Sequence, residues 1–214
     1  RDSGPQDVNG VSHGAAGFAY ALAALAEATG REDFAQAARD CLAFENASYD
    51  ATRRNWPDLH DETPPGAAAP DEEARWPRRW CHGATGVGLA RLGMLKRGRA
   101  GVADLAAELA ADVENAVEGV RRGWPRDRHT LCCGGLGAVE FYCEAADALG
   151  RAELRAFAAG ALADLLERAA ADGDYRWDSG ARRFNPGLFR GLAGVGYTAL
   201  RRLDATLPNV LIWD

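Results

Sequence analysis

The sequence lacks any apolar run that approaches the roughly 20 residues needed to cross a lipid bilayer. Its N-terminus also lacks the charged and then apolar pattern of a secretory signal. These absences argue against a membrane span and predict a soluble protein of the cytoplasm.

An excess of basic residues is also absent, since 25 lysines and arginines are outnumbered by 31 aspartates and glutamates. The formal net charge is −6, and no block of like charge extends beyond a few residues. Proteins that hold nucleic acid do so largely by neutralising phosphates with lysine and arginine. We therefore expect no nucleic-acid partner.

Cysteine is scarce and odd in number, with five residues in a chain of 214. A chain of this length can bury a core without disulfides, and an odd count does not suit a disulfide framework. β-Branched residues are few, and apolar and polar residues never alternate over a sustained stretch, which argues against strands. Amphipathic stretches of helical spacing are present instead, such as Leu105, Leu109, Val113, Val117 and Val120. The sequence predicts a nearly all-α protein with reduced thiols.

A phrase of the form G-x-x-G occurs four times: Ser12-His-Gly-Ala-Ala-Gly17, Cys81-His-Gly-Ala-Thr-Gly86, Cys132-Cys-Gly-Gly-Leu-Gly137 and Phe189-Arg-Gly-Leu-Ala-Gly194. The first glycines are separated by 69, 51 and 57 residues, and an Ala- and Leu-rich stretch follows each phrase. This spacing fits one hairpin of two helices per repeat, and hairpins bury their inner faces only by stacking on one another. We predict that residues 1–214 form a single domain, an α/α toroid of helical hairpins or an arc of one. Each glycine phrase would lie in the turn that enters an inner helix.

The two residues before the first glycine of each phrase are unusually reactive for a structural turn: Ser12 and His13, Cys81 and His82, Cys132 and Cys133, and Phe189 and Arg190. If the four turns meet at one rim, three thiols meet there. Three thiolates with one open position are typical of a catalytic zinc site. Adjacent cysteines can share an ion only in an irregular turn, which Gly134 and Gly135 would provide.

We therefore take Cys81, Cys132 and Cys133 as candidate ligands of Zn²⁺, and His13 and His82 as candidate catalytic residues. The alternative for any cysteine is that it fills space in the core, and we adopt it for Cys41 and Cys143. His82 could instead orient a metal ligand, and Arg190 could bind carbonyls or carboxylates at its helix terminus.

These motifs resemble those of the lanthionine synthetase C-like cyclases, in particular the C-terminal cyclase domain of class II lanthipeptide synthetases. The most specific are Trp80-Cys-His-Gly83 and, about fifty residues later, Leu131-Cys-Cys-Gly134, and the resemblance continues to Leu207-Pro-Asn-Val-Leu211.

The resemblance implies an α/α toroid of seven hairpins, of which this chain would be the last four. It also implies one zinc held by Cys81, Cys132 and Cys133, with His13 near the metal. Most relatives have histidine at the position of Cys133, so the chain resembles a subgroup with three cysteines. An arginine that the family places shortly before the Trp-Cys motif matches Arg78 or Arg79 only loosely.

The resemblance further implies an enzyme that adds cysteine thiols of a dehydrated precursor peptide to dehydroalanine or dehydrobutyrine. The products are the thioether rings of lanthionine and methyllanthionine. An upstream dehydratase domain in the same chain could supply the dehydrated peptide, and His13 is the candidate general acid. Two alternatives stay open: another thiol-activating zinc toroid such as a prenyltransferase-like protein, and a non-catalytic zinc-stabilised scaffold or peptide-binding fragment.

Overall fold

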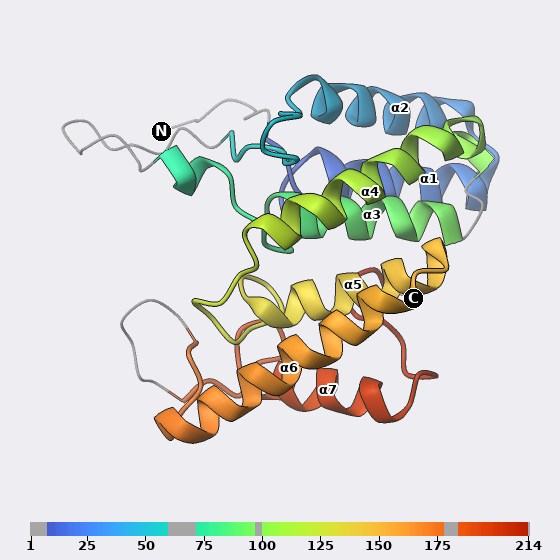
Figure 1. Ribbon diagram of the computed structural model, residues 1–214. Helices are drawn as coiled ribbons and strands as arrows, with labels where there is room; N and C mark the ends of the chain where they lie inside the picture. Colours follow the sequence, from blue (N-terminus) through green and yellow to red (C-terminus); the bar gives the residue numbers. More distant parts are fainter. Residues whose placement is uncertain (1–7, 60–71, 97–99, 178–183, 214) are drawn as a thin grey trace, which may run out of the picture.

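The computed structural model describes residues 8–59, 72–96, 100–177 and 184–213 (Figure 1). Within them there are seven α-helices and two short 3-10 helices: α1 (Ala15–Thr29), α2 (Glu32–Ala47), η1 (Glu72–Arg75), α3 (Ala84–Lys96), η2 (Ala100–Leu105), α4 (Ala106–Arg122), α5 (Gly135–Leu149), α6 (Ala152–Asp172) and α7 (Leu192–Leu203). The same residues contain no strand, and only two isolated β-bridges occur. None of these helices combines the length and apolar character that a membrane span requires. The all-α prediction is confirmed.

The helices pair in chain order, α1 with α2, α3 with α4 and α5 with α6, and each pair forms a hairpin (Figure 1). α1, α3, α5 and α7 also contact one another in that order, so they form a row of inner helices. The result is an arc of hairpins, in which α7 begins a fourth repeat and is followed by the irregular segment 204–213. This architecture is the predicted one, an arc of an α/α toroid.

Two of the hairpins turn in the same way. Gly30 follows α1 and Gly150 follows α5 as the C-cap residue, and their φ angles of 67° and 65° are rarely adopted by residues with side chains. The N–H of each glycine donates to a carbonyl in the last helical turn, that of Ala26 or Ala146. Because a single residue then precedes the next helix, α2 and α6 fold back along α1 and α5.

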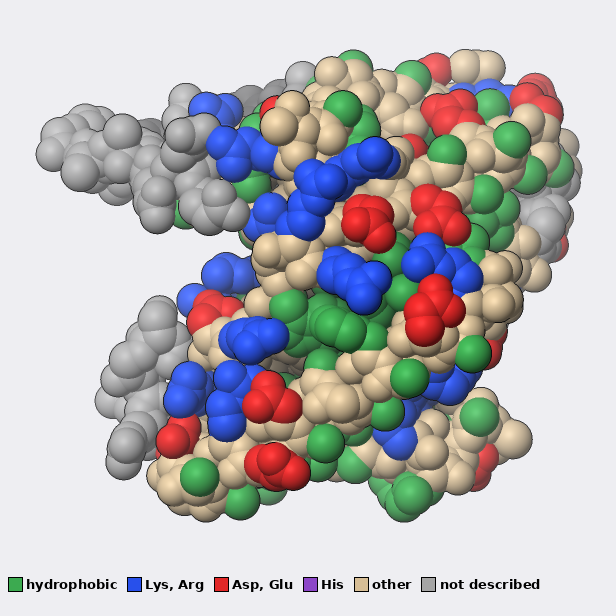
Figure 2. Space-filling view, in the orientation of Figure 1, with side chains coloured by type: hydrophobic (Ala, Val, Ile, Leu, Met, Phe, Trp, Pro, Cys, Tyr) green, Lys and Arg blue, Asp and Glu red, His purple; other side chains and the backbone are tan. Residues whose placement is uncertain are grey.

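Burial distinguishes the centre of the arc from its ends. Nearly every residue of α3 and α5 is buried, whereas α1 and α7 keep apolar side chains exposed, among them Phe18 and Leu203. The partner helices are amphipathic as predicted, and α4 buries Leu109, Val113 and Val120. On the face shown in Figure 2, basic and acidic side chains lie near one another over the helices, with apolar side chains exposed between them.

The second glycine of every phrase lies against a carbonyl oxygen six residues earlier in the chain. A Cβ atom on this glycine would lie 1.9 to 2.4 Å from that oxygen, whereas real Cβ atoms keep at least 3.0 Å. The pairs are Gly17 with Val11, Gly86 with Trp80, Gly137 with Leu131, and Gly194 with Leu188. Glycine at this position therefore lets each turn fold tightly onto the first turn of its inner helix.

The segment 204–213 returns to the beginning of the chain. The Tyr20 hydroxyl donates to the carbonyl oxygen of Ile212 at 2.5 Å, and the Trp80 indole N–H donates to that of Leu211 at 3.0 Å. The side chains of Leu211 and Ile212 are buried in the same hydrophobic cluster as those of the inner helices. The end of the chain is therefore tied to the first and second repeats.

Candidate metal centre

The four glycine phrases lie side by side and are joined by backbone hydrogen bonds between equivalent residues. The N–H of Ser12 donates to the carbonyl of Cys81 at 3.4 Å, that of Cys81 to Cys132 at 3.3 Å, and that of Cys132 to Phe189 at 2.9 Å. An inner helix begins directly after the first glycine of each phrase. The structure therefore brings the four turns to one rim of the arc, as the repeat predicts.

Three sulfur atoms meet at this rim. The Sγ atoms of Cys81 and Cys133 lie 3.7 Å apart, those of Cys132 and Cys133 lie 3.1 Å apart, and all three lie within 4.8 Å of one another. Zinc bound tetrahedrally by thiolates at about 2.3 Å places its sulfurs about 3.8 Å apart. The donor type and the spacing thus fit a divalent metal ion. Cys81 is half-buried and the other two cysteines are buried, so the cluster is accessible at Cys81.

Cys132 and Cys133 both lie in the turn that precedes α5, which explains how neighbouring residues direct their sulfurs to one point. The N–H of Cys133 donates to the Thr130 hydroxyl oxygen at 3.2 Å, and the N–H of Gly135 donates to the carbonyl of Arg128 at 3.0 Å. A Cβ atom on Gly134 would lie 2.2 Å from that same Arg128 oxygen. The irregular turn expected from the glycines is therefore present.

The cluster favours one ionised thiol even without a metal. Hydrogen bonds from the thiols of Cys132 and Cys81 lower the pKa of Cys133 well below its ordinary value, and the positive charges of Arg190 and Arg79 act in the same direction. The pKa of Cys81 is raised, because its thiol is hydrogen-bonded to Cys132 and Cys133 and is partly buried. The cluster thus carries negative charge on Cys133, where a cation could bind.

The two candidate histidines lie on neighbouring turns, with ring centroids 6.5 Å apart. His82 is partly buried, and its Nδ1 atom lies 3.3 Å from the carbonyl oxygen of Asn9 and 3.8 Å from Oδ1 of Asp58. His13 is exposed. His82 is therefore held in place by its neighbours, whereas His13 presents its ring to solvent. Neither contact of His82 was predicted from the sequence, since Asn9 lies just before the first glycine phrase and Asp58 lies between the first and the second.

The structure distinguishes the two arginines that precede the Trp-Cys motif. The guanidinium of Arg78 donates to the carbonyl oxygen of Gly119 on α4 at 2.8 Å, so it supports the packing of the hairpin. The positive charge of Arg79 helps to lower the pKa of Cys133. Its guanidinium also lies 3.5 Å from Oδ2 of Asp127. Of the two, Arg79 is therefore the arginine whose charge favours the ionised form of Cys133.

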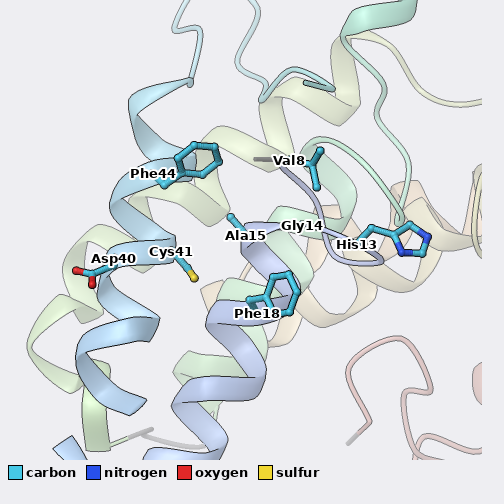
Figure 3. Close-up of a pocket in the computed structure, with 8 residues that line it drawn as sticks. All are labelled: Val8, His13, Gly14, Ala15, Phe18, Asp40, Cys41 and Phe44. Carbon is cyan, nitrogen blue, oxygen red and sulfur yellow. The ribbon is translucent and has the colours of Figure 1, made fainter. Parts of the chain in front are cut away.

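Apolar surface flanks His13. A pocket of about 290 Å³ lies between α1 and α2 and is lined by His13, Phe18, Cys41 and Phe44 among others (Figure 3). A second pocket, of about 410 Å³, shares His13 and Phe18 and extends to Trp213. Cys41 thus lines a pocket rather than the sulfur cluster, and Cys143 is buried in α5, where the Arg202 guanidinium contacts its sulfur.

Comparison with known proteins agrees with this geometry. No curated protein matches the chain. The family described as lanthionine synthetase C-like protein matches residues 4–212, which is nearly the whole sequence. The chain with four glycine turns and three converging cysteines therefore belongs to the lanthionine synthetase C-like protein family.

Proposed function

We propose that the protein is a zinc-dependent peptide cyclase that adds cysteine thiols to dehydroalanine or dehydrobutyrine in a dehydrated precursor peptide. The observation that carries the proposal is the cluster of three sulfurs within 4.8 Å, at the rim of the arc, in a member of this family. Cys81, Cys132 and Cys133 would hold the ion. Bound zinc lowers the pKa of a coordinated thiol, so that a thiolate forms near neutral pH.

The addition itself balances without any further reactant. The substrate thiolate forms a C–S bond to the β-carbon of the dehydroamino acid while the C=C π electrons move toward the carbonyl group. The resulting enolate takes a proton at its α-carbon. His13 would deliver that proton as general acid, since its exposed ring lies on the turn next to that of Cys81. His82, fixed by Asn9, would orient the groups around the cluster.

Zinc content and turnover of a dehydrated peptide test the proposal together. We expect one zinc per chain and cyclisation of a peptide that carries one cysteine and one dehydroalanine. Cyclisation removes the alkylatable thiol without changing the peptide mass, so alkylation followed by mass spectrometry detects it. Cys81→Ser should lose both zinc and cyclisation, whereas Cys41→Ser, which changes a thiol outside the cluster, should keep both.

The two outcomes that contradict the proposal differ in meaning. If the protein holds no stoichiometric zinc under reducing conditions, the three cysteines do not form a metal centre. Zinc-loaded protein that leaves the peptide open would favour the non-catalytic scaffold instead.

A further inference from the structure

Arg190 occupies the position of the repeat at which the other three phrases carry His13, His82 and Cys133. The turn that bears it is fixed beside the cysteines. The N–H of Cys132 donates to the carbonyl oxygen of Phe189, the residue before Arg190, at 2.9 Å. The Phe189 ring also packs against that of Trp80, with centroids 5.2 Å apart. Arg190 therefore belongs to the same rim as the sulfur cluster.

Arg190 directly follows Phe189, whose carbonyl oxygen accepts the N–H of Cys132, and its guanidinium forms a hydrogen bond with the Cys132 side chain. Arg190 is exposed, so a ligand that approaches the cluster can reach the guanidinium as well. Along the rim, the hydrogen-bonded order of the turns places His13 on one flank of the cysteines and Arg190 on the other.

A divalent ion held by three thiolates has a net charge of −1, and an incoming substrate thiolate would make it −2. Like charges a few ångströms apart repel strongly where water is partly excluded. A fixed cation at the rim offsets this repulsion, and arginine keeps its charge at every pH at which a protein is folded. A cation beside the position that the substrate sulfur enters would therefore stabilise the bound thiolate.

We propose that Arg190 is the anion-binding residue of the centre, whose guanidinium holds the thiolate of the substrate beside the three cysteines. The inference rests on the proposed metal centre. It goes beyond the proposed function because it assigns a substrate-binding role to the fourth glycine phrase.

Thiol binding to cobalt-loaded protein tests this without any peptide, because sulfur-to-cobalt absorption reports each bound thiolate. We expect Arg190→Gln and Arg190→Met to raise the Kd for 2-mercaptoethanol about tenfold or more, at unchanged cobalt content. Arg190→Lys, which keeps the charge, should stay within about threefold of the unsubstituted protein. Arg31→Gln serves as the matched control, because Arg31 lies at the turn between α1 and α2.

A neutral ligand separates charge from structure. Imidazole adds no charge to the centre, so its Kd should be the same in all variants. The proposal is overturned by an unchanged Kd for 2-mercaptoethanol in the two neutral variants. It is also overturned if imidazole binding weakens equally, or if these variants no longer hold cobalt, since Arg190 would then be structural. A clear effect of Arg190 on thiol binding, in protein that does not cyclise peptides, would contradict the cyclase and leave this inference intact.

Discussion

His13 differs from the other side chains of the rim in having an exposed ring. Its backbone position is nevertheless fixed, because the preceding residue, Ser12, donates its N–H to Cys81 at 3.4 Å. A residue that delivers a proton must reach the substrate and return to solvent for another proton. An exposed side chain on a fixed turn meets both requirements.

We therefore expect His13→Ala to slow cyclisation by about 10²- to 10⁴-fold, the usual contribution of a general acid. Zinc content should not change, because His13 is not one of the three sulfur donors. Single-turnover rates on a dehydrated peptide measure the effect. Ser12→Ala, which removes only a hydroxyl 3.5 Å from the Cys81 carbonyl, is the control and should stay near the unsubstituted rate. A His13→Ala rate within a few-fold of that control would assign the proton delivery to another group.

Arg91 shows how buried charges support the same rim. Its fully buried guanidinium lies 2.9 Å from Glu45 and 3.1 Å from Asp112. Glu45 in turn accepts the N–H of Gly10 at 3.0 Å, three residues before His13. Burial raises the pKa of Glu45, and the charge of Arg91 opposes that rise. The turn that carries His13 thus depends on an ion pair between α2 and α3.

Arg91→Met should lower the free energy of unfolding by about 3–5 kcal/mol, because two carboxylates lose their buried partner. Without Arg91 the pKa of Glu45 rises further above its ordinary 4.5. Between pH 4.5 and this higher pKa, the folded variant holds a proton that the unfolded chain releases. The free energy of unfolding of the variant therefore falls as the pH rises through this range. Urea unfolding should show a larger deficit at pH 8 than at pH 5.

The surface pair of Arg39 and Asp104 provides the comparison for that variant. Arg39→Met should cost less than about 1 kcal/mol. An Arg91→Met deficit as small as this, or one independent of pH, would mean that the buried pair contributes little.

Among the structural elements, the turn formed by each G-x-x-G phrase depends only on residues close together in the chain. For that reason its position before each inner helix could be predicted from the sequence. Each second glycine lies against a carbonyl only six residues away, so the constraint is contained within one short stretch of chain. Repetition of this turn places the starts of α1, α3, α5 and α7 at equivalent positions. It also brings Cys81 together with Cys132 and Cys133. Residue types at equivalent positions then sufficed to identify the cluster.

Gly86→Ala tests the close approach of glycine and carbonyl oxygen at the start of α3. Its Cβ atom would lie 1.9 Å from the carbonyl oxygen of Trp80, so the turn that carries Cys81 must move. We expect a loss of about 2 kcal/mol or more in unfolding free energy, together with weaker zinc retention against a chelator. Gly160→Ala is the matched change within α6, where no atom lies within 4 Å of the new Cβ. It should stabilise the protein by about 0.5–1 kcal/mol, and equal effects of the two changes would refute the close approach.

The sequence did not predict how the segment 204–213 packs against the inner helices. The hydrogen bond from Tyr20 to Ile212 joins residues 192 positions apart, and the one from Trp80 to Leu211 joins residues 131 apart. Periodicity describes the face of one helix, but it contains no information on which distant segment covers that face. The buried network of Arg91 escaped prediction for the same reason, since its partners come from α2 and α4.

The terminal segment also reaches the candidate metal centre through Trp80, which immediately precedes Cys81 and donates to the Leu211 carbonyl at 3.0 Å. Loss of apolar burial in this segment should therefore affect stability and the sulfur cluster together. Ile212 is 2% exposed, and Ile212→Ala should cost about 2–5 kcal/mol in unfolding free energy. Chelator competition should show faster zinc loss from the same variant.

Leu203→Ala removes a side chain of the same size from the same end of the chain, but Leu203 is 87% exposed on α7. Its cost should stay within about 0.5 kcal/mol, with unchanged zinc retention. If Ile212→Ala unfolds at lower urea yet loses zinc no faster than Leu203→Ala, the segment stabilises the arc without supporting Cys81. If both variants match the unsubstituted protein, the return of the chain end to α1 contributes nothing to the fold. A loss in both measurements for Ile212→Ala alone would show that closure of the chain end and the geometry of the three sulfurs are energetically coupled.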